Sequence, residues 1–182
     1  QRQWGTYGRD AGGYSGNKIT PKGVLDNKDG LLVFWQNQRE GNRQQRPSML
    51  EGQRFDKDGT RLWGDKGLLV KITGLAGGDG YNANMFGIVP DHHGGAILAF
   101  SQGFDEKGTS YGVMTQRVSS NGNKLWGGGI IVYKGDENQS YESVISSRDG
   151  GAFVTVSLTE TYQSILTLYR IGPDGKQLWS NE

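Results

Sequence analysis

The sequence lacks cysteine, an excess of either charge and any long apolar segment, and each lack removes a class of protein. None of the 182 residues is cysteine, so disulfides and thiolate metal sites are excluded. The 20 basic and 19 acidic side chains give a net charge of +1, which supplies no long-range attraction to nucleic acid or to an anionic membrane. The longest apolar runs, such as 95–100 and 129–133, fall far short of the roughly 20 residues that cross a bilayer. We expect no nucleic-acid partner and no membrane span.

A sustained helical pattern is also missing. No stretch keeps apolar residues at a 3.6-residue period for three turns, and turn residues interrupt every candidate helix. The 31 glycines fall at set positions instead of in low-complexity tracts, as expected for many tight turns between short strands. The sequence therefore predicts an all-β protein with almost no helix.

One tryptophan motif recurs along the chain. Its middle copy reads Gln116-Arg117-Val118, then Asn121-Gly122, then Leu125-Trp126-Gly127, and a truncated copy opens the chain. The motif tryptophans are Trp4, Trp63, Trp126 and Trp179, and the motif glycines are Gly59, Gly122 and Gly175. Spacings of about 53 to 63 residues between the tryptophans indicate a repeated supersecondary unit with variable loops.

A second pattern runs in step with the tryptophan motif. Apolar runs that start with glycine occupy 30–35, 95–100 and 151–156, and each indicates a buried strand because it is too short for a helix. The middle unit then resolves into four antiparallel strands, predicted at 84–89, 95–100, 111–118 and 124–133. Within a single domain over 1–182, the predicted units are 9–67, 68–133 and 134–182, and residues 1–8 form a strand of a preceding unit.

Such units cannot stand alone. A four-stranded sheet of about 55 residues has two apolar faces and cannot bury both, so the copies must stack face to face. Radial stacking gives a β-propeller, whereas a linear β-solenoid has shorter periods and a barrel does not need a regular tryptophan motif. We predict β-propeller blades, namely three four-stranded antiparallel units plus an extra N-terminal strand.

The segments 58–63, 121–126 and 174–179 resemble the tryptophan-docking repeats of bacterial extracytoplasmic propellers. Those families include quinoprotein dehydrogenases, the propeller lipoprotein of outer-membrane-protein assembly, and many secreted propeller repeats. The resemblance implies that each motif tryptophan lies on the outermost strand of a blade and packs between neighbouring blades. It also implies an extracellular, cell-surface or periplasmic location in a bacterium. Quinone chemistry does not transfer, because the adjacent cysteines common beside that cofactor are absent, so we expect no cofactor.

The number of units leaves the ring incomplete. Known propellers have about four to eight blades, and the chain holds three complete units. Both ends supply the same tryptophan-bearing strand, 2–8 and 176–182, so the termini duplicate each other. Either the chain is a segment of a longer parent, which also fits its start at Gln1, or several copies associate to complete a ring. Exposed strand edges favour self-association or partner binding in both cases.

Candidate binding residues lie in the loops that are long and different in every unit, because variable loops on a rigid scaffold commonly carry function. Three arginines in one loop suit an anionic or sugar ligand, and a carboxylate beside an aromatic ring suits carbohydrate. Two further loop aromatics suit a sugar or a peptide. The alternative for all of them is a solvated loop or a cover over neighbouring apolar surface. The candidates are Arg39, Arg43, Arg46, Asp79, Tyr81, Phe104 and Tyr162.

Metal and catalytic motifs are not recognisable. The histidines of Asp91-His92-His93 are adjacent, and adjacent residues on an extended strand point to opposite sides, so we expect no metal there. Several aspartates are better explained as turn formers than as calcium ligands, namely Asp26, Asp29, Asp56 and Asp58. Arg54, Arg117 and Arg170 occupy one place in each repeat, which favours a shared structural role.

The sequence favours a non-catalytic propeller module that binds a protein or a glycan through long loops or open strand edges. The alternative is a polysaccharide-processing hydrolase or lyase. Its carboxylates would come from loops around Asp79, Asp105, Asp136 and Glu137.

Overall fold

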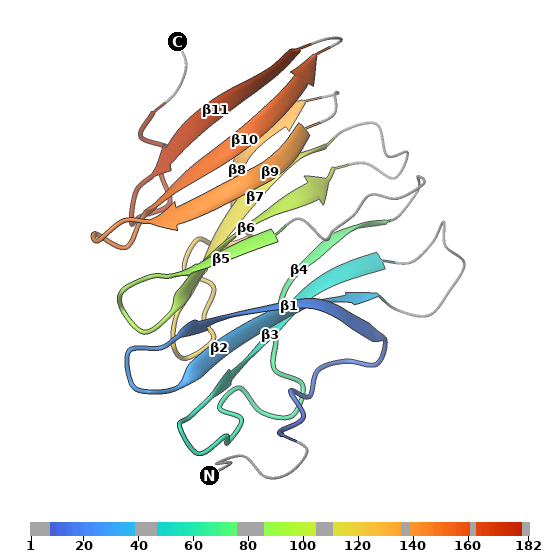
Figure 1. The fold of residues 1–182 in the computed structure, drawn as a ribbon, viewed down its shortest axis with the longest axis vertical. Coiled ribbons are helices and arrows are strands. Elements are labelled where there is room, and N and C mark those ends of the chain that lie inside the picture. The colour runs from blue at the N-terminus through green and yellow to red at the C-terminus, as the bar shows by residue number, and fades with distance from the viewer. Residues whose placement is uncertain are drawn as a thin grey trace.

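The computed structural model describes residues 8–38, 47–75, 86–104, 111–135, 139–160 and 163–179. Within these ranges the protein is all-β, with no helical residue, and eleven strands form antiparallel sheets of four, four and three strands. The three sheets lie as successive layers along the long axis of the molecule (Figure 1). Across the described ranges, no helix is long and apolar enough to span a membrane.

The first two sheets share one topology, in which each strand pairs with the next strand in the chain. The first sheet contains β1 (Asn17–Leu25), β2 (Leu31–Gln38), β3 (Pro47–Phe55) and β4 (Leu68–Leu75), in that order. The second sheet contains β5 (Phe86–Pro90), β6 (Ala96–Gly103), β7 (Tyr111–Val118) and β8 (Ile130–Gly135). Both are antiparallel meanders, as the sequence predicts.

The third sheet has three strands in the described residues. They are β9 (Gln139–Ser146), β10 (Ala152–Glu160) and β11 (Gln163–Ile171), with β10 in the centre. The fourth strand predicted at 176–182 is not formed over 176–179, where a single bridge joins Ile171 to Gln177. The third sheet is therefore one strand narrower than its neighbours.

Alternating side chains explain why the sheets stack. In β6, Ala96 and Leu98 belong to the apolar cluster shared with the first sheet, whereas Ile97 and Ala99 belong to the cluster shared with the third. Successive residues of a strand point to opposite faces, so a continuous apolar run is what a strand buried on both sides requires. The glycine-started run at 95–100 thus marks the centre of the stack.

The tryptophan motif does not lie on a strand, which corrects one expectation. The outermost strand predicted at 124–133 begins only at Ile130, and Trp126 lies in the connection between β7 and β8. Gly127 and Gly129 cause the difference, because their φ angles of 57° and 99° interrupt an extended chain. For the same reason β4 starts at Leu68, so the first sheet runs past the unit boundary expected at residue 67. Residues 1–7, with Trp4 and most of the predicted extra strand, lie outside the described residues.

Candidate functional site

The connections between strands are divided between two ends of the stack. Short turns join β1 to β2, β5 to β6 and β9 to β10 at the end that Figure 1 shows on the left. The ends of β2, β6 and β10 lie at the opposite end. The connections there contain most of the predicted ligand-binding residues, and these lie outside the described residues: Arg39, Arg43, Arg46, Asp79, Tyr81 and Tyr162. The same holds for Asp105, Asp136 and Glu137.

Phe104 is the candidate ligand-binding residue that the structure describes. Its half-buried ring packs against the apolar cluster between the first and second sheets. The Lys134 ammonium lies 5.1 Å from the ring centroid, at cation–π distance. A Cβ added to Gly112 would stand 2.9 Å from the ring, so glycine there leaves room for it. The structure thus places this aromatic ring over the end of the second sheet.

At the short-turn end, one ion pair recurs in all three sheets. Arg54 Nη2 lies 2.6 Å from Asp26 Oδ2, Arg117 Nε lies 3.0 Å from Asp91 Oδ2, and Arg170 Nη2 lies 2.6 Å from Asp149 Oδ2. The aspartate comes from the first turn of each sheet and the arginine from the end of its third strand. The shared structural role expected for the three arginines therefore includes a specific acidic partner.

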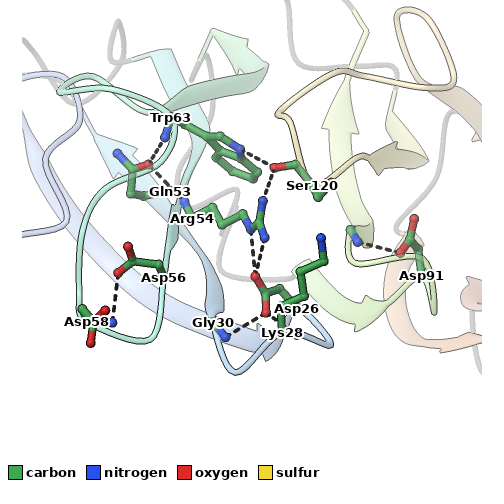
Figure 2. Close-up of polar contacts among 11 residues, drawn as sticks. Asp26, Lys28, Gly30, Gln53, Arg54, Asp56, Asp58, Trp63, Asp91 and Ser120 are labelled. Atoms are coloured by element: carbon green, nitrogen blue, oxygen red, sulfur yellow. Dashed lines mark hydrogen bonds and ion pairs between the residues drawn. The ribbon is translucent and has the colours of Figure 1, made fainter. Parts of the chain in front are cut away.

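The aspartate of each pair uses its two oxygens for different tasks. Asp26 Oδ1 accepts the backbone N–H groups of Lys28 and Gly30, both at 2.8 Å, and Oδ2 accepts the guanidinium (Figure 2). Asp91 repeats this arrangement, with its Oδ1 accepting the N–H groups of His93 and Gly95 at 2.8 and 2.7 Å. A single carboxylate thus closes the turn and holds the neighbouring strand, which agrees with the expected role of Asp26 as a turn former.

These contacts shift the pKa of the first and third aspartates. Burial of Asp26 favours its neutral form, but the Arg54 guanidinium and the Lys28 and Gly30 N–H groups outweigh burial and hold its pKa below the usual value. At Asp149, hydrogen bonds from the Ser147 hydroxyl and a backbone N–H lower the pKa. Both carboxylates are therefore charged acceptors at neutral pH.

The motif tryptophans join one sheet to the next. Trp63 Nε1 donates to the Ser120 carbonyl at 3.0 Å, and Trp126 Nε1 donates to the Pro173 carbonyl at 3.1 Å. Each acceptor lies in the turn after the third strand of the following sheet. The motif glycine of that turn lies beneath the indole, since a Cβ added to Gly122 would stand 3.3 Å from Trp63 and one added to Gly175 2.9 Å from Trp126. The same contact is therefore made twice in succession.

The first contact is reinforced by the ion pair. Arg54 Nη1 also donates to the Ser120 carbonyl at 3.1 Å, so one carbonyl of the second sheet binds both a guanidinium and an indole of the first (Figure 2). The Trp63 ring meets Phe34 edge to face at a centroid distance of 5.8 Å. The polar and apolar halves of this indole therefore both have partners.

A glutamine fixes each of these tryptophan turns. Gln53 Oε1 accepts the Trp63 N–H at 2.9 Å while its Nε2 donates to the Gly64 carbonyl at 2.7 Å. Gln116 makes the same two bonds around Trp126, at 3.1 and 2.9 Å. In the third copy, Tyr169 takes the place of the glutamine.

The third motif tryptophan has a different environment. Trp179 is 51% exposed, whereas Trp126 is 5% exposed. Its ring lies 5.5 Å from the ring of Phe153, on the side of the third sheet that faces away from the second. The turn of the third motif copy nevertheless has the same backbone conformation as the other two, since Gly59, Gly122 and Gly175 have φ angles of 80°, 80° and 82°.

The histidine pair is used within the turns. His93 Nδ1 lies 2.8 Å from the Asp91 carbonyl, and His92 Nε2 lies 3.1 Å from the Ser146 hydroxyl of β9. Over the part of the chain that the structure describes, no three side chains of the metal-binding types come together. The pair thus has structural partners on its own turn and on the third sheet.

One buried polar cluster has no counterpart in the predictions from sequence. The Glu51 carboxylate lies in the first sheet without exposure, and its oxygens accept Trp35 Nε1 at 3.1 Å and Asn37 Nδ2 at 3.0 Å. Asn37 also donates to the carbonyls of Tyr14 and Ser15. Asn37 thus binds the N-terminal segment to the sheet, and the carboxylate that accepts from Asn37 does not face solvent.

A sequence signal for the ion pairs existed. In the first two units an aspartate stands four residues before the glycine that starts the apolar run, as in Asp26 to Gly30, and the third unit has Asp149 two residues before Gly151. The signal for Glu51 was weaker, because a single acidic residue within a strand is normally exposed. No protein-family model matches this chain, and no curated protein matches its sequence significantly.

Proposed function

We propose that this chain is a non-catalytic β-propeller-type module that binds a protein or a glycan. The observation that carries the proposal is the repeated indole contact. The first sheet contacts the second through Trp63 and Ser120, and the second contacts the third through Trp126 and Pro173. In both contacts the indole N–H donates to a backbone carbonyl in the turn after the third strand, and the motif glycine of that turn lies beneath the ring. A contact repeated with one geometry relates successive sheets by one operation, which is how blades are arranged about an axis.

The tightly bonded turn end supports a scaffold role there. The aspartates of the recurring ion pairs, such as Asp26 and Asp91, are engaged by arginine and by backbone N–H groups, which leaves these carboxylates little bonding capacity for a ligand. Binding is therefore assigned to the opposite end, where residues 39–46 follow β2, residues 104–110 follow β6 and residues 76–85 join β4 to β5. Phe104 flanks that end, and the arginines at 39, 43 and 46 follow β2 in the sequence.

The resemblance of the repeats to extracytoplasmic propellers supports a place at a bacterial surface or in the periplasm. The absence of cysteine is compatible with that compartment, because the fold does not depend on disulfides for stability.

Binding is tested with a charge-matched pair of variants. The protein and a triple variant, Arg39→Ala, Arg43→Ala and Arg46→Ala, are applied to a glycan array and to immobilised bacterial envelope proteins. The control removes three positive charges at the turn end through Lys28→Ala, Lys57→Ala and Lys124→Ala. We expect the arginine variant to lose at least tenfold in affinity for a ligand that the control still binds.

Two results would overturn the proposal. One is an equal loss of ligand affinity in both triple variants, which would show that the affinity depends on net charge and not on the three arginines. The other is release of shorter products from a polysaccharide during the same incubation, because that would establish the hydrolase or lyase alternative.

A further inference from the structure

The outer face of the third sheet presents large apolar side chains among small polar ones, and no other sheet covers it in the described residues. It combines Ile145 of β9, Phe153 of β10, and Leu166 and Leu168 of β11, with Trp179 beside Phe153. Leu166 is 67% exposed and Ile145 is 59% exposed. Figure 1 shows the third sheet at one end of the stack, with the second sheet on its other side. Contiguous exposed apolar side chains of this kind mark interaction surfaces.

The equivalent positions of the first and second sheets are buried. Leu166 corresponds to Leu50 and Val113, which are 2% and 0% exposed because the next sheet covers them. Phe153 likewise corresponds to Ile97, which is buried between the second and third sheets. At these two positions the open face therefore carries large apolar side chains, as the sheet–sheet contacts already present in the stack do.

The opposite end of the stack is covered over part of its face. On the outer face of the first sheet, Trp35 and Glu51 are buried beneath the N-terminal segment. A Cβ added to Gly13 of that segment would stand 2.9 Å from the Trp35 ring, so the fit is close. Asn37 bonds to two carbonyls of the same segment. A second chain cannot add to this end without displacing residues 12–15.

Within the described residues, one end of the stack is occupied by residues 12–15 and the other end is open, which restricts how copies associate. Head-to-tail association joins two different surfaces and needs both ends, whereas a two-fold dimer uses one surface twice. We propose that the outer face of the third sheet is a dimer interface, on which a second copy of this chain docks with its own third sheet. This surface lies on a different part of the molecule from the proposed ligand-binding end, so the two proposals stand independently.

The face is suited to packing against itself. A row of small side chains, Ser143, Thr155 and Ser157, runs beside the leucines of β11, with Thr155 opposite Leu168 and Ser157 opposite Leu166. In a two-fold arrangement the leucines of one copy lie over the small row of the other. The hydroxyls of Ser143 and Thr155 are 2.7 Å apart and bond to each other, which reduces the cost of covering them.

The size of the face indicates a reversible dimer. Three strands about 4.8 Å apart and about nine residues long present roughly 14 Å by 30 Å of sheet per copy. The total area buried is then on the order of 1,000 Å², near the lower limit for specific interfaces. A dissociation constant in the micromolar range is the expected consequence.

Sedimentation velocity over a concentration series from about 1 to 300 µM tests the dimer. The wild type is compared with Leu168→Glu, which puts a charge in the face, and with Leu25→Glu, a matched control at an exposed leucine of β1. We expect a monomer–dimer equilibrium for the wild type and the control, and at least a tenfold weaker dimer for Leu168→Glu. Circular dichroism checks that each variant is folded, and Leu166→Lys replaces Leu168→Glu if that variant unfolds.

Engineered thiols give a second readout, since the chain has no cysteine of its own. Thr155→Cys, in the centre of the face, should be joined into a covalent dimer by a bismaleimide crosslinker about 10 Å long, because facing sheets lie about 10 Å apart, and Lys28→Cys at the turn end should not. The proposal is overturned by a wild type that stays monomeric to 300 µM, by a dimer that Leu168→Glu leaves unchanged, or by growth beyond a dimer, which would indicate head-to-tail association.

Discussion

Replacing Trp126 by alanine removes the contact that joins the second sheet to the third. The indole is 5% exposed, packs on Gly175 and donates to the Pro173 carbonyl. A tryptophan that buries about 150–250 Å² contributes roughly 4–6 kcal/mol at about 25 cal/mol per Å², as an upper bound. Trp→Ala substitutions in cores cost about 3–5 kcal/mol, so we expect a loss of that size in the free energy of unfolding.

Urea denaturation followed by far-ultraviolet circular dichroism measures this loss at 25 °C. Leu125→Ala is the matched control, because the neighbouring side chain is 48% exposed and should cost less than about 1 kcal/mol. Trp126→Phe separates the ring from its N–H group and should cost about 1–3 kcal/mol, since the Pro173 carbonyl loses its donor. A loss below about 1 kcal/mol for Trp126→Ala, no larger than that of the control, would refute the role of this indole between the sheets.

The remaining predictions concern the turns. Asp91→Ala should lower the free energy of unfolding by about 3–5 kcal/mol, because the carboxylate that it removes is 1% exposed and is the acidic partner of Arg117. Asp149→Ala should cost about 1 kcal/mol or less, because Asp149 is 48% exposed and Arg170 keeps its hydrogen bonds to the carbonyls of Ala152 and Ile171; equal losses in urea titrations would contradict this. Gly175→Ala should lower the melting temperature more than Gly127→Ala, since both glycines have positive φ but a methyl group at 175 meets the indole and one at 127 meets open space. Because the pKa of Asp26 is lowered on folding, its contribution is present above its unfolded pKa of about 3.9 and is lost as pH falls through the folded value. The stability difference between wild type and Asp26→Asn should therefore shrink in acid, and a difference that stays constant from pH 6 to pH 2 would argue against the ion pair.

The strands that start with glycine could be predicted from sequence, and the sheets follow from them. The runs at 30–35, 95–100 and 151–156 form the first parts of β2, β6 and β10. Short apolar runs that start at a turn glycine suit buried strands, and β6 is covered on both faces. The turns were predictable as well, since Gly122 and its equivalents supply the positive φ that the hairpins need.

The position of the tryptophan and its partners could not be predicted in the same way. A pattern of apolar residues does not distinguish a strand from a turn that presents one large ring, and Trp126 lies in such a turn because glycines follow it. The acceptor of its N–H is the carbonyl of Pro173, and a backbone carbonyl leaves no trace in the sequence. Glu51 was missed because its two donors come from β2, a different strand of the sheet.

Hydrogen exchange of the indole N–H groups, followed by NMR at a concentration where the chain is monomeric, tests the central claim most directly. Each signal is assigned from the matching Trp→Phe variant. The Trp63 and Trp126 N–H groups, which donate to carbonyls of the next sheet, should exchange at least a hundredfold more slowly than that of the exposed Trp179. Exchange of Trp126 as fast as that of Trp179 would contradict the joining of successive sheets by these indoles.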